Sequence, residues 1–300
     1  MLSLPLVIWL AAVAVPSLAP APARSDGAQP SGRQGEVITG TSVELLPHPP
    51  FGALEAGLSG EAGRFYATAI SAIRGGQHRR ALTAARQARV ICYQTLRGGS
   101  GLAPVSRQLA SRHFSRALYL EEQLSEITLI EEQLERPPDR SDQRSLLLQL
   151  RALLLHNLFL AVRGFSGVSD SRLLTQSIRA YQAAIEDADT LKHSLIVGYA
   201  AMLAERGQRH EARAAFAKLS EHEREQETMD IAVAYYYLAL GDRSRSIARL
   251  LEAARRDSWL RGSPGREGHS FRSQVYRMND FDRLRDHPRF IELVTTPEEQ

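Results

Sequence analysis

The chain has little cysteine and little lysine, and each shortage excludes a class of protein. Cys92 is the single cysteine among 300 residues, so no disulfide can form within the chain. It lies in the apolar stretch ARVICYQTL, which favours a buried, inert thiol over a nucleophile. Lysine occurs only at Lys192 and Lys218, and the many arginines are interleaved with acids. Because a nucleic-acid-binding protein usually carries a segregated basic face, this pattern argues against nucleic acid as a partner.

Proline and strand-like alternation are scarce in the middle of the chain. From Glu61 to Asp257 proline occurs only at Pro104, Pro137 and Pro138, and no stretch shows convincing period-two alternation. Alanine, leucine, arginine, glutamate and glutamine dominate there, so the sequence predicts an all-α protein. The expected helices cover residues 60–74, 78–96, 105–135, 143–163, 171–187, 193–206, 209–222, 227–240 and 243–257, with a last short helix in HPRFIELV.

Signatures of catalysis are also missing. No Gly-Lys pair exists, so there is no phosphate-binding P-loop. The stretch HEREQ begins like a zinc-protease motif, but Gln226 stands where the second histidine ligand would be needed. The nine histidines are scattered, with no pair at ligand spacing. The sequence therefore predicts a protein that is not an enzyme and that needs no metal or cofactor.

The N-terminus predicts export. An uncharged run extends from Leu4 to Val15, and Ala21 and Ala23 form an A-x-A pattern before Arg24. This arrangement is typical of a secretory signal peptide, here residues 1–23, and implies a periplasmic or secreted protein. Because no lysine or arginine precedes the apolar run, an uncleaved anchor remains the alternative. Residues 24–58 are rich in glycine, proline, serine and alanine, which predicts a disordered linker.

Two long helical stretches in the middle of the chain allow more than one interpretation. The stretch SLLLQLRALLLHNLFLAV in 143–163 is very apolar, but Arg151 and Asn157 would be costly in a bilayer, so a buried helix is favoured. The stretch LEEQLSEITLIEEQL in 105–135 is amphipathic. It could dimerise or receive a partner helix, but an antiparallel hairpin with 143–163 is the preferred interpretation. We expect no stable membrane span once the signal peptide is removed.

One phrase occurs three times along the chain. It reads GGQHRRALTAARQA at 75–88, RGQRHEARAAFAKL at 206–219 and LGDRSRSIARLLEA at 240–253. Each copy has a glycine, a few polar residues and an Ala/Leu-rich helical stretch. The glycine allows a positive φ that closes a tight turn, and small residues on the two helices let their backbones approach. The sequence therefore predicts repeated helical hairpins.

The repeats resemble the tetratricopeptide repeat, or TPR, a unit of two antiparallel helices in 34 residues. Gly207 and Gly241 are 34 positions apart, and residues 193–226 and 227–260 both fit the pattern. The resemblance is partial over 62–95 and 145–192 and absent from 105–135. It implies a right-handed α-solenoid over residues 59–300. The tail, residues 261–300, is similar to the segment that closes many bacterial TPR proteins, with an apolar cap of Phe281, Leu284, Phe290 and Leu293.

The resemblance also implies a binding surface, because TPR solenoids bind along the concave face formed by the first helix of each pair. Lysine and asparagine, which hold a terminal carboxylate in many such proteins, are absent from these positions here. We therefore expect an apolar helix or extended segment as the bound partner. Tyr235 lies in the run YYY and either faces an open groove or is covered by a neighbouring helix. The expected partner-binding residues are Tyr66, Ile70, Ile73, Val197, Ala201, Ala204, Ile231, Tyr235 and Leu238.

Two functions follow from these observations. The first is a non-catalytic scaffold or adaptor of the cell envelope that binds a protein or peptide on its concave face. The second is an enzyme, or an enzyme subunit, with its site in residues 97–170. An open concave face would favour the scaffold, whereas a closed polar pocket with perturbed titratable groups around His113 or His156 would favour the enzyme.

Overall fold

The computed structural model describes residues 61–98, 104–136, 141–166, 170–188, 193–225, 229–256 and 279–295. The expected signal peptide, 1–23, and the expected linker, 24–58, lie outside these residues. The described parts are helical and contain no strand, as the sequence predicts. The helices are α3 (Glu61–Arg74), α4 (His78–Gly98), α5 (Pro104–Glu135), α6 (Ser141–Ser166), α7 (Ser171–Glu186), α8 (His193–Glu205), α9 (Arg209–Phe216), α10 (Glu221–Arg224), α11 (Asp230–Ala239), α12 (Arg243–Arg256), the 3₁₀ helix η2 (Asn279–Leu284) and α15 (Pro288–Thr295).

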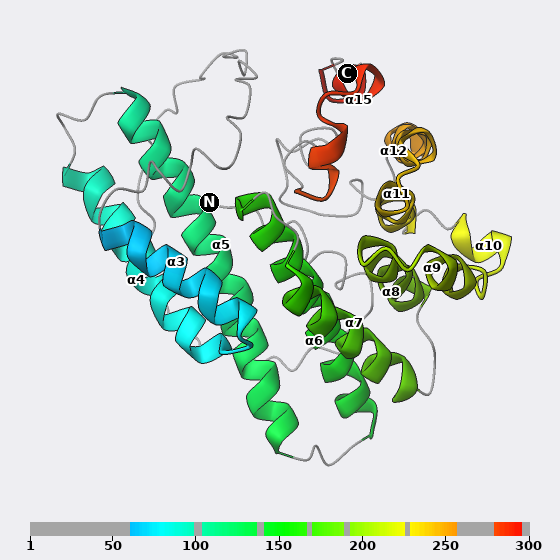
Figure 1. The fold of residues 1–300 in the computed structure, drawn as a ribbon, viewed down its shortest axis with the longest axis horizontal. Helices are drawn as coiled ribbons and strands as arrows, with labels where there is room; N and C mark the ends of the chain where they lie inside the picture. The colour runs from blue at the N-terminus through cyan, green and yellow to red at the C-terminus, as the bar shows by residue number, and fades with distance from the viewer. Residues whose placement is uncertain are drawn as a thin grey trace, which may run out of the picture. The chain divides into compact units, whose positions relative to one another are not determined.

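Helices that follow one another in the chain pack against each other. The pairs α3–α4, α8–α9 and α11–α12 form hairpins, and α4, α5, α6, α7 and α8 are each in contact with the next helix (Figure 1). Helix α8 also packs against α11, so the first helices of the last two hairpins lie side by side. This order is typical of a fold built from local contacts, in which each helix buries its apolar face on its neighbours.

The three repeated phrases form the same turn. Gly76, Gly207 and Gly241 have φ values of 69°, 84° and 86°. In the second copy the amide of Gly207 donates to the carbonyl of Ala204 at 2.9 Å, and the amide of Gln208 donates to that of Leu203 at 3.0 Å. Equivalent bonds close the other two turns. This pair of bonds is the Schellman motif, which needs a left-handed residue and so explains why glycine is repeated.

Small residues fill the equivalent contact positions of the three hairpins. Ala69, Ala200 and Ala234 on the first helices all have no exposed surface. The equivalent positions early in the second helices are also fully buried, and they are occupied by Ala81, Ala212 and Ser246. Because these side chains are short, the helix backbones can approach closely. The burial of these small residues and the pairing of the helices into hairpins are therefore confirmed.

The apolar helix in the middle of the chain is mostly covered by the rest of the protein. Within the described residues, Asp142–Gly164 is the one segment that is long and apolar enough to cross a membrane. In its most apolar stretch, 67% of the residues are buried inside the protein. Helix α6 packs on α5 and α7, so the predicted hairpin between 105–135 and 143–163 is present. A buried core helix can be as long and as apolar as a helix that spans a membrane, so these two properties alone do not separate the two.

The described part of the C-terminal tail packs on the rest of the protein, and its role as a cap stays a prediction. The four residues predicted to close the repeats are at most 3% exposed, and they are Phe281, Leu284, Phe290 and Leu293. Helix α15 lies on α12, at the end of the last hairpin. The η2 segment reaches further, because it contacts both α11 and α6.

One predicted helix is divided in the structure. Residues 209–222 were expected to be continuous, but α9 ends at Phe216 and a short helix, α10, begins at Glu221. The side chain of Ser220 accepts from the amide of Glu223, and the Glu223 carboxylate accepts from the amide of Ser220 at 2.6 Å. This capping box starts a new helix, and its S-x-x-E signal is visible in the sequence as SEHE.

Candidate functional site

Most of the expected partner-binding residues are buried in this structure. Seven of the nine are buried, and they are Ile70, Ile73, Val197, Ala201, Ala204, Tyr235 and Leu238. Tyr66 and Ile231 are half-buried. Their role in partner binding stays a prediction, and it would require the elements that cover them to move.

The run YYY illustrates how this face is covered. Tyr236 stacks on Phe216 of the preceding hairpin, with ring centroids 4.1 Å apart. Tyr237 is half-buried. Tyr235 is 3% exposed and directs its hydroxyl toward helix α6. Of the two interpretations that the sequence left open for Tyr235, a covering helix fits this structure.

A polar cluster joins α6 to α8, α11 and η2, and we call it the Arg163 cluster. The Arg163 guanidinium donates to the carboxylate of Glu205 at 2.8 Å and to the hydroxyl of Tyr235 at 3.2 Å. The Tyr235 hydroxyl donates to the same carboxylate at 2.8 Å, and Arg283 also pairs with it. Burial acts to lower the pKa of Arg163, but the neighbouring Tyr235 and Glu205 outweigh it and raise that pKa. The cluster therefore holds a charged pair between helices far apart in sequence.

His156 lies next to this cluster on α6. Its Nδ1 is 2.8 Å from the hydroxyl oxygen of Tyr181, and the rings of Tyr181 and Tyr235 lie 5.9 and 5.5 Å from its own. Burial, with a further contribution from the charge of Arg163, lowers the pKa of His156 to about 3. A closed polar pocket with perturbed titratable groups around His113 or His156 was expected to favour an enzyme, and one such perturbed group is present here. However, an imidazole with so low a pKa is a weak base at neutral pH, which makes proton abstraction by it inefficient.

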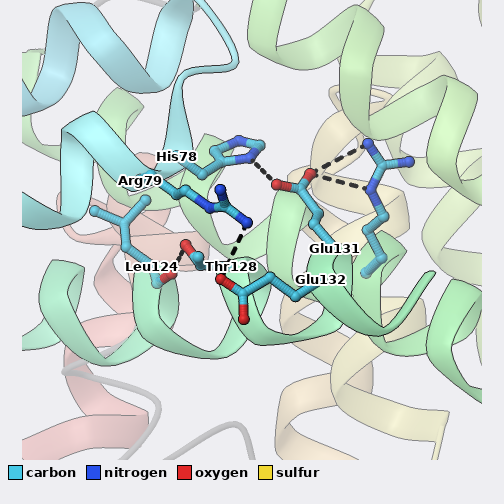
Figure 2. Close-up of polar contacts among 7 residues, drawn as sticks. His78, Arg79, Leu124, Thr128, Glu131 and Glu132 are labelled. Carbon is cyan, nitrogen blue, oxygen red and sulfur yellow. Dashed lines mark hydrogen bonds and ion pairs between the residues drawn. The ribbon is translucent and has the colours of Figure 1, made fainter. Parts of the chain in front are cut away.

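A second polar cluster connects α4, α5 and α6. The Nδ1 of buried His78 lies 2.9 Å from the carboxylate of Glu131, and Arg151 pairs with the other oxygen of that carboxylate at 3.3 Å. Figure 2 shows Glu131 between His78 and a guanidinium, with Arg79 and Glu132 paired alongside. Burial acts to raise the pKa of Glu131, but the hydrogen bond and charge of His78 and the charge of Arg151 outweigh it and lower that pKa. Each of these polar contacts joins two different helices, which favours a structural role for the cluster.

The outer surface of α4 and α5 carries exposed apolar side chains. Among the described residues, large apolar side chains more than 40% exposed are found at Val90, Tyr93, Leu129 and Ile291. Val90 and Tyr93 are three positions apart on α4, so they share a face of that helix. The Tyr93 ring lies 6.1 Å from that of half-buried Phe114 on α5. We call Val90, Tyr93 and Phe114 the α4–α5 apolar patch.

Sequence reasoning did not identify either polar cluster or this patch. Glu205 and Tyr235 are 30 residues apart, and Arg163 and Tyr235 are 72 apart, so no local spacing indicates their contact. The patch had a weak signal, since Tyr93 and Val90 lie off the apolar stripe that contains Cys92 and Ala88. Such a deviation from helical periodicity could have been found by comparing the two faces of 78–96.

The described residues hold no group of three or more histidine, cysteine or acidic side chains placed to bind a metal ion. No protein family model, curated protein or solved structure matches this chain.

Proposed function

We propose that this protein is a non-catalytic scaffold of the cell envelope, built from TPR-like helical hairpins, that binds a protein partner. The observation that carries the proposal is the repetition of one hairpin at three places, with the same Schellman turn and the same buried small residues. Serial hairpins of this kind generate extended surfaces, and proteins use such surfaces mainly to bind other proteins. Export through the signal peptide and a right-handed solenoid belong to the same proposal.

The α4–α5 apolar patch is the surface that suits this role in the folded chain. Tyr235, one of the residues expected on the concave face, is covered, because Arg163 of α6 donates a hydrogen bond to its hydroxyl. The patch, by contrast, presents Tyr93 at 50% and Val90 at 43% exposure. An aromatic ring beside an aliphatic side chain offers a large rigid contact area, which is typical of an anchor for an apolar helix or an extended segment.

Site-specific photo-crosslinking in the protein's own host tests the proposal. A photo-reactive amino acid replaces Tyr93 in one variant and the exposed Glu211 of α9 in a matched control. We expect a crosslinked protein from position 93 only. Adding Val90→Asp to the first variant should abolish the product, because a charge in the patch opposes burial of the partner.

The outcomes separate a specific partner from non-specific capture. A product that appears from both positions, or that survives Val90→Asp, would contradict binding through the patch. No product from either position would contradict the scaffold proposal for this surface. A product of twice the chain's mass, sensitive to Val90→Asp, would identify the partner as a second copy of the chain.

A further inference from the structure

A basic cleft lies between the end of α3, the first part of α7 and the turn after α8. Its volume is about 570 Å³, and four arginines line it, namely Arg74, Arg172, Arg179 and Arg206. Ser171 and Thr175 add hydroxyl groups to the lining. Clefts that bind small molecules typically measure some 300 to 1,000 Å³, so this one has a suitable size.

Ion pairs among the described residues balance the charge in the cleft only in part. Arg74 pairs with Asp170 at 2.9 Å. Among the described residues, no carboxylate forms an ion pair with the guanidinium of Arg172, Arg179 or Arg206. Many other arginines do have such a partner, as Arg163 has Glu205. Arg172, Arg179 and Arg206 are exposed to water, which weakens the repulsion between like charges, but an anion in the cleft would be attracted by all three.

The residues that line the cleft come from the end of α3, from α7 and from the turn after α8, and Arg172, Arg179 and Arg206 are exposed. Ser171, Thr175 and Arg179 are spaced by four residues on α7, so they lie along one side of that helix. Gln176 approaches the α3–α4 turn, where a Cβ added to Gly76 would lie 3.4 Å from its amide nitrogen. The amides at the start of α7 are already engaged, because Asp170 accepts from Arg172 and Leu173. Recognition in the cleft therefore rests on the side chains.

We propose that this cleft binds a small oxyanion that carries two or more negative charges, of the phosphate or carboxylate class. The planar guanidinium group offers paired N–H donors that match two oxygens of one phosphate or carboxylate. Three such groups without acidic partners favour a multiply charged ligand over a single carboxylate. The hydroxyl of Ser171 and the amide of Gln176 add neutral donors within the same cleft, whereas the Thr175 hydroxyl donates to the backbone carbonyl of Ser171 at 2.7 Å.

Isothermal titration of the full-length chain tests the proposal with two probes, inorganic pyrophosphate and citrate. The variant Arg172→Gln/Arg179→Gln removes two of the arginines. The matched control, Arg255→Gln/Arg289→Gln, removes the same charge from exposed positions on α12 and α15. We expect saturable binding of at least one probe with one ligand per chain. The affinity should fall by about tenfold or more in the cleft variant and remain within about twofold in the control, because charge-assisted contacts are lost only in the former.

The two probes distinguish the ligand class, and the variants test the location. Binding of pyrophosphate alone would assign the cleft to phosphates, and binding of citrate alone would assign it to carboxylates. The proposal is overturned if neither probe binds saturably. It is also overturned if the control variant weakens binding as much as the cleft variant, since the effect would then follow overall charge. The crosslinking experiment on the α4–α5 apolar patch is independent of both results.

Discussion

Single residues determine how closely neighbouring helices of this protein approach each other. Gly198 on α8 allows the ring of Tyr181 on α7 to lie against the helix backbone, and the Tyr181 hydroxyl then reaches His156 on α6. Three helices are thus joined through one residue that lacks a side chain. The same contact helps to hold the half-buried His156 in place, where its pKa is far below the ordinary value.

Gly198→Ala should destabilise the fold. A Cβ at this position would lie 2.6 Å from the Cζ atom of Tyr181, so the ring or the helix must move. We expect the free energy of unfolding to fall by about 1 to 3 kcal/mol, as is usual for an overpacked core. Urea denaturation measures the change. Gly98→Ala, at the end of α4 with open space around it, is the control and should have little effect.

His156 should make stability depend on pH below neutrality. Its pKa falls from 6.5 to about 3 in the folded protein, so below pH 6.5 the unfolded state binds a proton that the folded state does not. The stabilisation is complete above pH 6.5 and is lost as the pH falls toward 3, with a slope of up to about 1.4 kcal/mol per pH unit. Solvent near this half-buried side chain would make the slope smaller.

The comparison of His156→Gln with the native protein isolates this contribution. Urea unfolding is measured at several pH values between about 4 and 7.5, because histidine side chains change their charge within this range. The slope should decrease in His156→Gln and remain unchanged in His210→Gln, which alters an exposed histidine. Identical slopes for the native protein and His156→Gln would show that the histidine is protonated equally in both states.

At the scale of elements, helix α6 is connected to the last two hairpins by charge as well as by apolar contact. Arg163 is 14% exposed and Glu205 is 7% exposed, so their ion pair is largely removed from water. The guanidinium also lies over the rings of Phe159 and Tyr235. Loss of either charge would leave the other buried with fewer partners.

Arg163→Met should therefore weaken the attachment of α6. We expect a loss of about 2 to 4 kcal/mol in the free energy of unfolding, because Glu205 keeps only Arg283 and Tyr235 as partners. Arg163→Met/Glu205→Gln should recover part of that loss, since the uncompensated carboxylate is removed. Arg86→Met breaks a more exposed pair with Glu121 and should cost less than about 1 kcal/mol. Equal losses in Arg163→Met and Arg86→Met, measured by urea denaturation, would contradict this account.

At the scale of the whole molecule, most contacts join helices that are neighbours in sequence. The Arg163 cluster, the pairing of Arg74 with Asp170 and the packing of η2 on α6 are among the connections between more distant elements. In repeat proteins with such local packing, a hairpin can open without its distant neighbours.

A local defect should consequently have a local effect on hydrogen exchange. Gly241→Ala places a side chain at φ 86°, which strains the α11–α12 turn. We expect faster amide exchange in α11 and α12, measured by mass spectrometry, with no change in α3 and α4. Gly76→Ala is the reciprocal control and should affect α3 and α4. Faster exchange throughout the described helices in both variants would mean that the chain unfolds as one unit.

The sequence predicted the helices well, because they follow from local patterns. Helical periodicity, scarce proline and the glycine turns are short-range signals, and the structure confirms the hairpins at 61–98, 193–216 and 230–256. The division of 209–222 was missed because a continuous helix was inferred across Ser220, although the capping box was readable. The buried small residues were also predictable, since a fixed repeat spacing places them at the same point of each hairpin.

The sequence by itself determined that this chain forms repeated α-helical hairpins closed by left-handed glycines, since both features depend on residues within a few turns of each other. Only the tertiary structure decided which surfaces remain open. Helix α6 contacts Tyr235 on the face expected to bind a partner, and Arg74, Arg172 and Arg206 line one cleft although more than 90 residues separate the first two. Contacts between residues so distant in sequence depend on how the hairpins pack on one another, and no local periodicity in the sequence encodes that packing.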